Sequence, residues 1–241
     1  MKTKKNIIQT IISFVLLVSM LFQVVSISGA LTDYNSFTIR SYQSETKYKY
    51  SAHKLNNDFY QSAHNYMTVR AAVDSSGNAL PDAVYCIQPG YPINQSAMVH
   101  DADKSYLESV PSHVTTAAQK EMLLQAVLTY GETEGYWQVY GRGGSAELSK
   151  WFARYIATQI LLWEVITEDR DVNFNKPSHT YYVSALIDDF TAEGKSNVLA
   201  YYNDYVSKIQ ASLKTPNFNA DSVEMIYKNG VFTKKVVILC F

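Results

Sequence analysis

The chain has 241 residues, of which 47% are hydrophobic and 13% aromatic, and its formal net charge is −1. This composition excludes an intrinsically disordered chain. Residues 31–241 carry 18 basic and 22 acidic side chains, a net charge of −4, which excludes a protein that binds nucleic acid through a basic surface.

Residues 1–30 have the pattern of a secretory signal peptide. Three lysines precede an apolar stretch at 7–25, and small residues at 28–30 provide a cleavage site. An uncleaved membrane anchor is the alternative, but polar residues within the stretch favour cleavage. No second apolar run is long enough to span a membrane. We therefore expect a secreted mature chain without membrane contact.

The N-terminal part of the mature chain, residues 31–95, is expected to be rich in β-strands. Alternating and β-prone residues predict strands near Phe37–Ser41, Tyr48–Tyr50, Val69–Val73 and Ala83–Ile87. Prolines follow the last of these runs and end it, since proline cannot continue a strand ladder.

The middle of the chain, residues 112–214, is expected to hold about four helices. The first runs from Thr116 to Tyr130, with Thr116 and Gln119 in capping-box spacing, and a glycine-rich loop follows at 131–144. The other three are expected at about 145–167, 178–192 and 196–214.

The final segment, residues 217–241, returns to strand, with Asn229-Gly230 as a hairpin turn. Its apolar end at Cys240-Phe241 is typical of a truncated chain. Strands, then helices, then strands predict a single α+β domain at 31–241. We expect a β-rich, sandwich- or barrel-like part packed against the helices.

One polar residue interrupts an apolar helical face. The spacing of this face is 4, 3, 4, 3 and 4 residues, and its members are Leu148, Phe152, Tyr155, Gln159, Leu162 and Ile166. A buried amide without partners costs about 1–3 kcal/mol, so Gln159 needs a reason to be there. A hydrogen bond to a buried backbone group is one reason. Condensation with a buried cysteine thiol into an internal thioester is another.

The chain offers two cysteines, Cys86 and Cys240. A disulfide between them is one possibility in an exported protein. Cys86 also fits a small buried hydrophobic residue, or the thiol partner of Gln159.

Two motifs carry a resemblance to a known family. Tyr85-Cys86-Ile87 is followed, 73 residues after its cysteine, by Thr158-Gln159-Ile160-Leu161-Leu162-Trp163-Glu164. The pair resembles the thioester domains of Gram-positive surface adhesins, which carry an aromatic-Cys-Ile run and a Thr-Gln-x-Ala-Ile-Trp run. This chain departs from that pattern in its two leucines, which stand where alanine and isoleucine are usual. Weaker similarities at 128–131 and 215–218 extend the resemblance over most of the mature chain.

The resemblance implies that Cys86 and Gln159 form an internal thioester, which captures an amine such as a lysine of a host protein in a single covalent event. It implies an adhesin on the cell wall or in a pilus, a virulence-related role, and no cofactor. Tyr85 and Trp163 are expected to shield the bond. Thr158 is expected either near the acyl oxygen or bonded to its own helix. The five histidines lack metal-ligand spacing, so no metal site is expected.

Two alternative functions stay open. A cysteine hydrolase or transpeptidase would need Cys86 beside a histidine base such as His100, His113 or His179. A noncovalent binding module would use the aromatic loop at 135–140. For the thioester, His100 and His113 are candidate bases that deprotonate the attacking amine.

Overall fold

The computed structural model describes residues 37–51, 53–54, 60–61, 66–74, 76–89, 98–99, 105–214 and 237–239. All of them belong to one compact unit, Tyr34–Pro216 with Val236–Phe241. The strands are β1 (Phe37–Gln43), β2 (His53–Lys54), β3 (Tyr60–Gln61), β4 (Thr68–Asp74), β5 (Val84–Cys86), β6 (Met98–Val99) and β7 (Val237–Leu239). The helices are α2 (Ser105–Ser109), α3 (Ala117–Tyr130), α4 (Tyr136–Arg142), α5 (Ser145–Ile166) and α6 (Ala192–Lys214), with 3-10 helices η1 (Thr46–Tyr48) and η2 (Val183–Asp189).

The strands build one five-stranded sheet, in the order β6-β1-β4-β5-β7, and a separate pair β2-β3. β1 and β4 are antiparallel along their whole length, from Phe37 opposite Asp74 to Gln43 opposite Thr68. β5 and β7 run parallel, which brings the C-terminal strand beside the cysteine strand. The α+β class is confirmed. The described strands form one mixed five-stranded sheet and a two-stranded pair, which is not clearly the expected sandwich or barrel.

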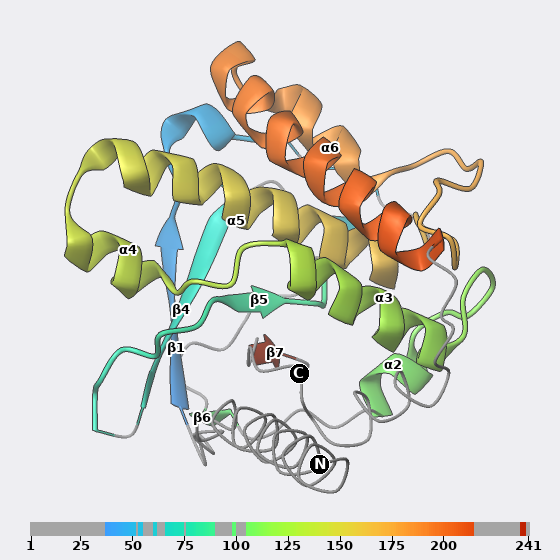
Figure 1. Ribbon diagram of the computed structural model, residues 1–241, viewed down its shortest axis with the longest axis horizontal. Coiled ribbons are helices and arrows are strands. Elements are labelled where there is room, and N and C mark those ends of the chain that lie inside the picture. The colour runs from blue at the N-terminus through green and yellow to red at the C-terminus, as the bar shows by residue number, and fades with distance from the viewer. Residues whose placement is uncertain are drawn as a thin grey trace, which may run out of the picture. The chain divides into compact units, whose positions relative to one another are not determined.

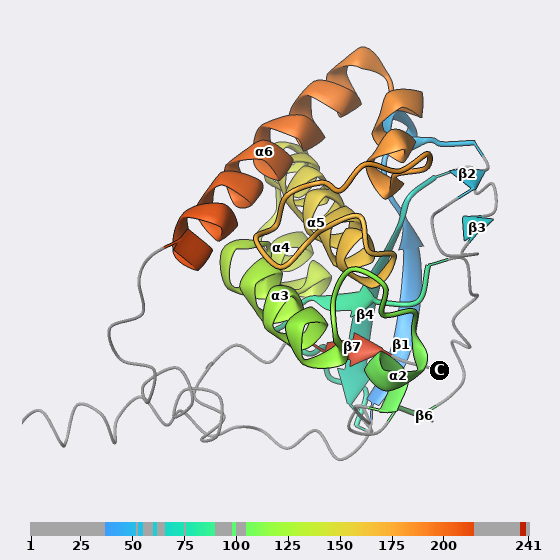
Figure 2. The same ribbon diagram turned by 90° about the vertical axis from the view of Figure 1, so that its right-hand side faces the viewer.

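Helix α5 lies at the centre of the unit (Figure 1), and Figure 2 shows α3, α5 and α6 on one side of the long strands β1 and β4. From Trp151 to Ile166 every residue of α5 except Arg154 is buried. The sequence pattern predicts one buried face. The structure buries the helix nearly all round, because β4, α3, α4, α6 and η2 all pack against it.

Helix α3 confirms the capping-box prediction. The Thr116 hydroxyl accepts from the Gln119 amide, and the Gln119 side chain accepts from the Thr116 amide. Gly131 follows α3 with a φ of −81°, so left-handed backbone is not the reason for a glycine there. A Cβ at Gly131 would lie 2.6 Å from two side-chain atoms of Thr158, so close packing against α5 requires glycine.

Several expected boundaries are corrected. The loop at 131–144 contains α4, which Gly143 and Gly144 at positive φ separate from α5. The helix expected at 178–192 is the shorter η2, and α6 begins at Ala192 rather than at about 196. Residues 46–48 form η1, and the strand expected around Tyr48–Tyr50 does not form. The 229–230 hairpin turn and residues 1–30 lie outside the described residues. Among the described helices, none is long and apolar enough to cross a membrane.

Candidate functional site

Gln159 and Cys86 are in direct contact. The Cys86 amide donates to Gln159 Oε1 at 3.0 Å, and Gln159 Nε2 donates to the Cys86 carbonyl at 2.6 Å. Gln159 is 1% exposed and Cys86 4% exposed. The side-chain amide of α5 thus pairs with both backbone groups of one strand residue, as a neighbouring strand would.

β4 and β5 separate next to this contact, and side chains of α5 bond the backbone groups that the two strands leave unpaired. β4 and β5 share a single register pair, Arg70 with Val84. There the Tyr155 hydroxyl accepts from the Arg70 amide at 3.0 Å and donates to the Val84 carbonyl at 2.5 Å. One turn further along α5, Gln159 bonds the amide and the carbonyl of Cys86 on β5 alone. The helix therefore replaces the missing ladder bonds, since buried backbone groups need partners.

This pairing bears on both explanations of the buried glutamine. It is the hydrogen bond to a buried backbone group that the sequence left open, and it satisfies the amide. It also brings the Gln159 carboxamide into contact with the backbone of the one described cysteine residue with which it could condense.

The Cys86 thiol is enclosed and protonated. Its sulfur lies 3.4 Å from the Gln88 carbonyl, to which the thiol donates. Burial raises the pKa of Cys86 above its usual value, and this effect exceeds the opposing influence of a backbone hydrogen bond at Gln88, the Arg70 charge and the Trp163 indole. A buried neutral thiol is inert toward solutes, in contrast to the exposed thiolate of a cysteine hydrolase.

The other predicted site residues lie around this pair. Tyr85 stacks on Tyr155, with ring centroids 4.6 Å apart, and donates to the Glu132 carbonyl at 2.6 Å. Trp163 is 7% exposed, and its indole lowers the pKa of the Cys86 thiol, against the larger effect of burial. Both rings are buried next to the Cys86 and Gln159 positions, and their shielding of a thioester stays a prediction.

Thr158 has the second of its two expected roles. Its hydroxyl donates to the Arg154 carbonyl one turn earlier and accepts from the Glu132 amide, each at 2.9 Å. It holds the turn after α3 against α5 and does not bond the Gln159 oxygen.

The candidate histidine bases do not gather at the thiol. His113 is exposed, and its backbone amide donates to Glu168. His179 lies 3.0 Å from Asp169, next to the polar loop after α5. His100 and Cys240 lie outside the described residues. Within the described ranges, no group of three or more His, Cys, Asp or Glu side chains is placed to hold a metal ion.

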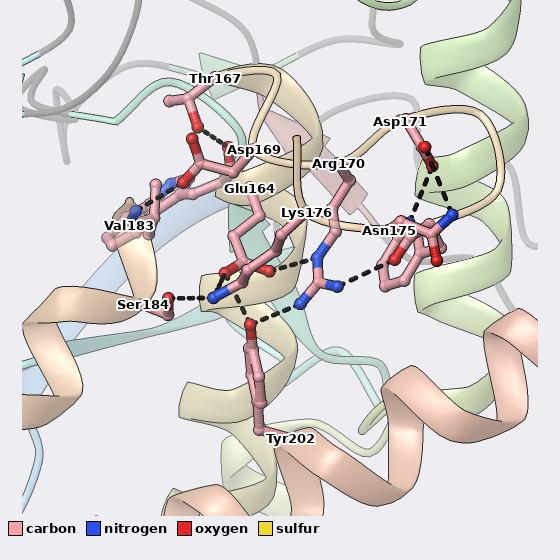
Figure 3. Close-up of polar contacts among 12 residues, drawn as sticks. Glu164, Thr167, Asp169, Arg170, Asp171, Asn175, Lys176, Val183, Ser184 and Tyr202 are labelled. Atoms are coloured by element: carbon pink, nitrogen blue, oxygen red, sulfur yellow. Dashed lines mark hydrogen bonds and ion pairs between the residues drawn. The ribbon is translucent and has the colours of Figure 1, made fainter. Parts of the chain in front are cut away.

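Sequence reasoning missed a polar network at the C-terminal end of α5 (Figure 3). The Glu164 carboxylate accepts from Arg170 Nε at 2.7 Å and from the Tyr202 hydroxyl at 2.7 Å, and Lys176 lies 3.3 Å away. A second buried pair, Lys120 with Glu168 at 2.7 Å, joins α3 to the same loop. The run Glu164 to Arg170 was the available signal, because it places four charged residues within seven positions at and just after the apolar C-terminal half of α5.

Beside this network lies a pocket of about 280 Å³ between η2, α6 and the preceding loop. Lys176, Tyr182, Ser184, Lys195 and Tyr202 are among its lining residues. Both lysines are already paired, Lys176 with Ser184 and Glu164, and Lys195 with Asp188. These contacts describe a network that ties α6 and the loop to α5.

An aromatic cluster covers the other end of α5. Tyr136 stacks on Tyr42 and on Tyr140, and Trp137 meets Tyr42 and Tyr140 edge-on. Tyr140 is 56% exposed, so this cluster reaches the surface at the loop that the sequence singled out for noncovalent binding.

Comparison with known proteins adds no relative: no protein-family model, no curated protein and no solved structure matches this chain.

Proposed function

We propose that the chain is a secreted, surface-associated adhesin domain in which Cys86 and Gln159 form an internal thioester that captures amines. The observation that carries the proposal is the double hydrogen bond between the Gln159 carboxamide and the Cys86 backbone. It aligns the two residues within a water-poor site between β5 and α5.

The same contacts suit the bond-forming step. The Cys86 sulfur attacks the Gln159 Cδ, the C–N bond breaks, and the thiol proton leaves with the nitrogen as ammonia. The Cys86 amide already points at the Gln159 oxygen, so it stabilises the negative charge that develops there. The product removes a buried amide and a buried thiol together.

An amine that attacks the thioester forms an amide bond to the Gln159 acyl carbon and displaces the Cys86 sulfur. We expect the natural amine to be a lysine of a host extracellular protein, since a covalent bond to such a partner has no thermal off-rate. This is one event per molecule rather than turnover. The signal-peptide pattern of residues 1–30 supports secretion, and attachment to a Gram-positive cell wall follows from the family resemblance.

The test is the intact mass of the purified mature domain before and after methylamine. We expect a mass one ammonia below the calculated value, and a gain of one methylamine on treatment, mapped to Gln159 by peptide analysis. Gln159→Ala should show neither change while still folding. Gln138→Ala, which alters an exposed glutamine of α4, is the matched control and should behave as the unmodified chain.

A full-mass protein with an intact Gln159 and a titratable Cys86 thiol would overturn the proposal. A glutamate at position 159 in the isolated protein would instead show that a thioester formed and was hydrolysed.

The aromatic cluster of Tyr42, Tyr136, Trp137 and Tyr140 favours noncovalent binding as the second candidate. Tyr140 offers an exposed ring above a stacked aromatic base, a surface suited to stacking on a sugar or a protein side chain. Target binding that survives Cys86→Ala but is lost in Tyr140→Ala would favour this function over the covalent one.

A further inference from the structure

Two side chains near the Cys86 thiol carry buried donors without acceptors. Arg70 Nε and Nη1 and Trp163 Nε1 are shielded from solvent, and none has a partner within hydrogen-bond distance among the residues that the structure describes; the Trp163 indole is nevertheless near enough to the Cys86 sulfur to favour its thiolate form. Buried donors in folded proteins nearly always have partners, so these exceptions need an explanation.

Strand register and helix spacing explain why both side chains influence the Cys86 thiol. Arg70 is the register partner of Val84, and Cys86 follows Val84 by two residues, so Arg70 and Cys86 share a face of the sheet. Trp163 lies one turn beyond Gln159 on α5. The charge of Arg70 and the indole of Trp163 both favour the thiolate form of Cys86, against the burial that raises the pKa of this thiol.

We propose that Arg70 and Trp163 form a sulfur-binding site that stabilises the negative charge on Cys86 Sγ when an amine opens the thioester. The inference rests on the proposed thioester function. It names the residues that stabilise the leaving group of the reaction, the Cys86 sulfur.

The lone pair of the amine forms a C–N bond to Gln159 Cδ, the C–S bond breaks, and its electron pair goes to Cys86 Sγ. One amine proton is released and ends on the sulfur, giving an amide and a free thiol.

Donors near the sulfur stabilise the transition state of thioester opening more than they stabilise the intact thioester. The sulfur of a thioester is uncharged and a weak acceptor, so the donors stay unpaired until the C–S bond breaks. Their interaction is then strongest in the transition state, which is the condition for faster reaction. The oxygen of the same acyl group faces the Cys86 amide, so oxygen and sulfur have separate donors.

The first test measures the second-order rate constant of methylamine incorporation by intact mass, with Cys240→Ser in every variant so that Cys86 is the sole thiol. We expect Arg70→Gln to slow incorporation about tenfold or more, and Arg70→Lys, which keeps the charge, to slow it less. Trp163→Phe keeps the ring without the N–H donor and should also be slower. Arg40→Gln, at an exposed arginine on the neighbouring strand β1, is the matched control and should leave the rate unchanged.

The second test needs no thioester. In a Gln159→Ala, Cys240→Ser background, thiolate absorbance against pH gives the pKa of the Cys86 thiol. Arg70→Gln should raise this pKa by about one unit, and Arg40→Gln should not move it. A purely structural role of Arg70 would leave the thiol pKa where it is.

The two tests separate the two proposals. A protein without the ammonia-deficient mass ends the thioester function, whatever Arg70 does. An unchanged thiol pKa in Arg70→Gln overturns the sulfur-binding site even if incorporation slows, because the slower rate then reflects altered structure. If Arg70→Gln does not fold, Trp163→Phe decides by the same two measurements.

Discussion

The Tyr155 hydroxyl connects β4 to β5 where the two strands share one register pair. It lies fully buried and serves one backbone donor and one backbone acceptor, Arg70 and Val84. Burial raises its pKa, so the hydroxyl stays protonated and able to donate. At the residue scale, Tyr155 and Gln159 therefore have the same role: on successive turns of α5, each side chain satisfies backbone groups of β5.

Replacing Tyr155 by phenylalanine should leave both backbone groups unpaired in an apolar site. We expect the free energy of unfolding to fall by about 1–3 kcal/mol. Urea denaturation measures this, with Tyr140→Phe as the control at an exposed hydroxyl, where the change should be close to zero. A loss no larger than that of Tyr140→Phe would mean that water or a neighbouring group replaces the hydroxyl.

At the element scale, α3 depends on its N-terminal cap. The reciprocal bonds of Thr116 and Gln119 satisfy two of the amides that a helix leaves unpaired at its start. Because α3 packs on α5, the helix that carries Gln159, a frayed α3 would weaken that packing.

Thr116→Ala should therefore lower the free energy of unfolding by about 1 kcal/mol. Thr129→Ala tests the specificity of this effect. That threonine is exposed near the end of the same helix, and among the described residues its hydroxyl donates only to the Gln125 carbonyl one turn earlier, so its replacement should be neutral or slightly stabilising. Equal losses in the two variants, measured by urea denaturation, would contradict a capping role.

For the whole molecule, a Cys86–Gln159 bond would cross-link positions 73 residues apart in the chain. A cross-link of this span restricts the unfolded state and by chain-entropy reasoning contributes about 4 kcal/mol, in the manner of a disulfide.

Methylamine opens this cross-link without changing the rest of the chain. We expect the treated domain to unfold roughly 10 °C below the untreated one, as measured by differential scanning calorimetry. Gln159→Ala, which cannot form the bond, should melt at the same temperature with and without methylamine. An untreated domain that already melts like the treated one would show that no cross-link is present.

Local sequence determined much of this protein. The alternation at β1 and β4, the capping box at Thr116 and the spacing along α5 each specify an element through neighbouring residues, so pattern alone found them. The same reasoning paired Cys86 with Gln159, through one polar residue on an apolar face and a motif resemblance. The structure then places the two residues in hydrogen-bond contact.

Tertiary structure decided what depends on partners far apart in the chain. Gly131 is required by Thr158 rather than by its own φ, and α5 is buried all round because several elements converge on it. The charged network at Glu164 forms only when Arg170 and Tyr202 meet across two helices. The single register pair between β4 and β5, which leaves room for the Tyr155 and Gln159 side chains, likewise follows from packing, because no local pattern encodes where two strands part.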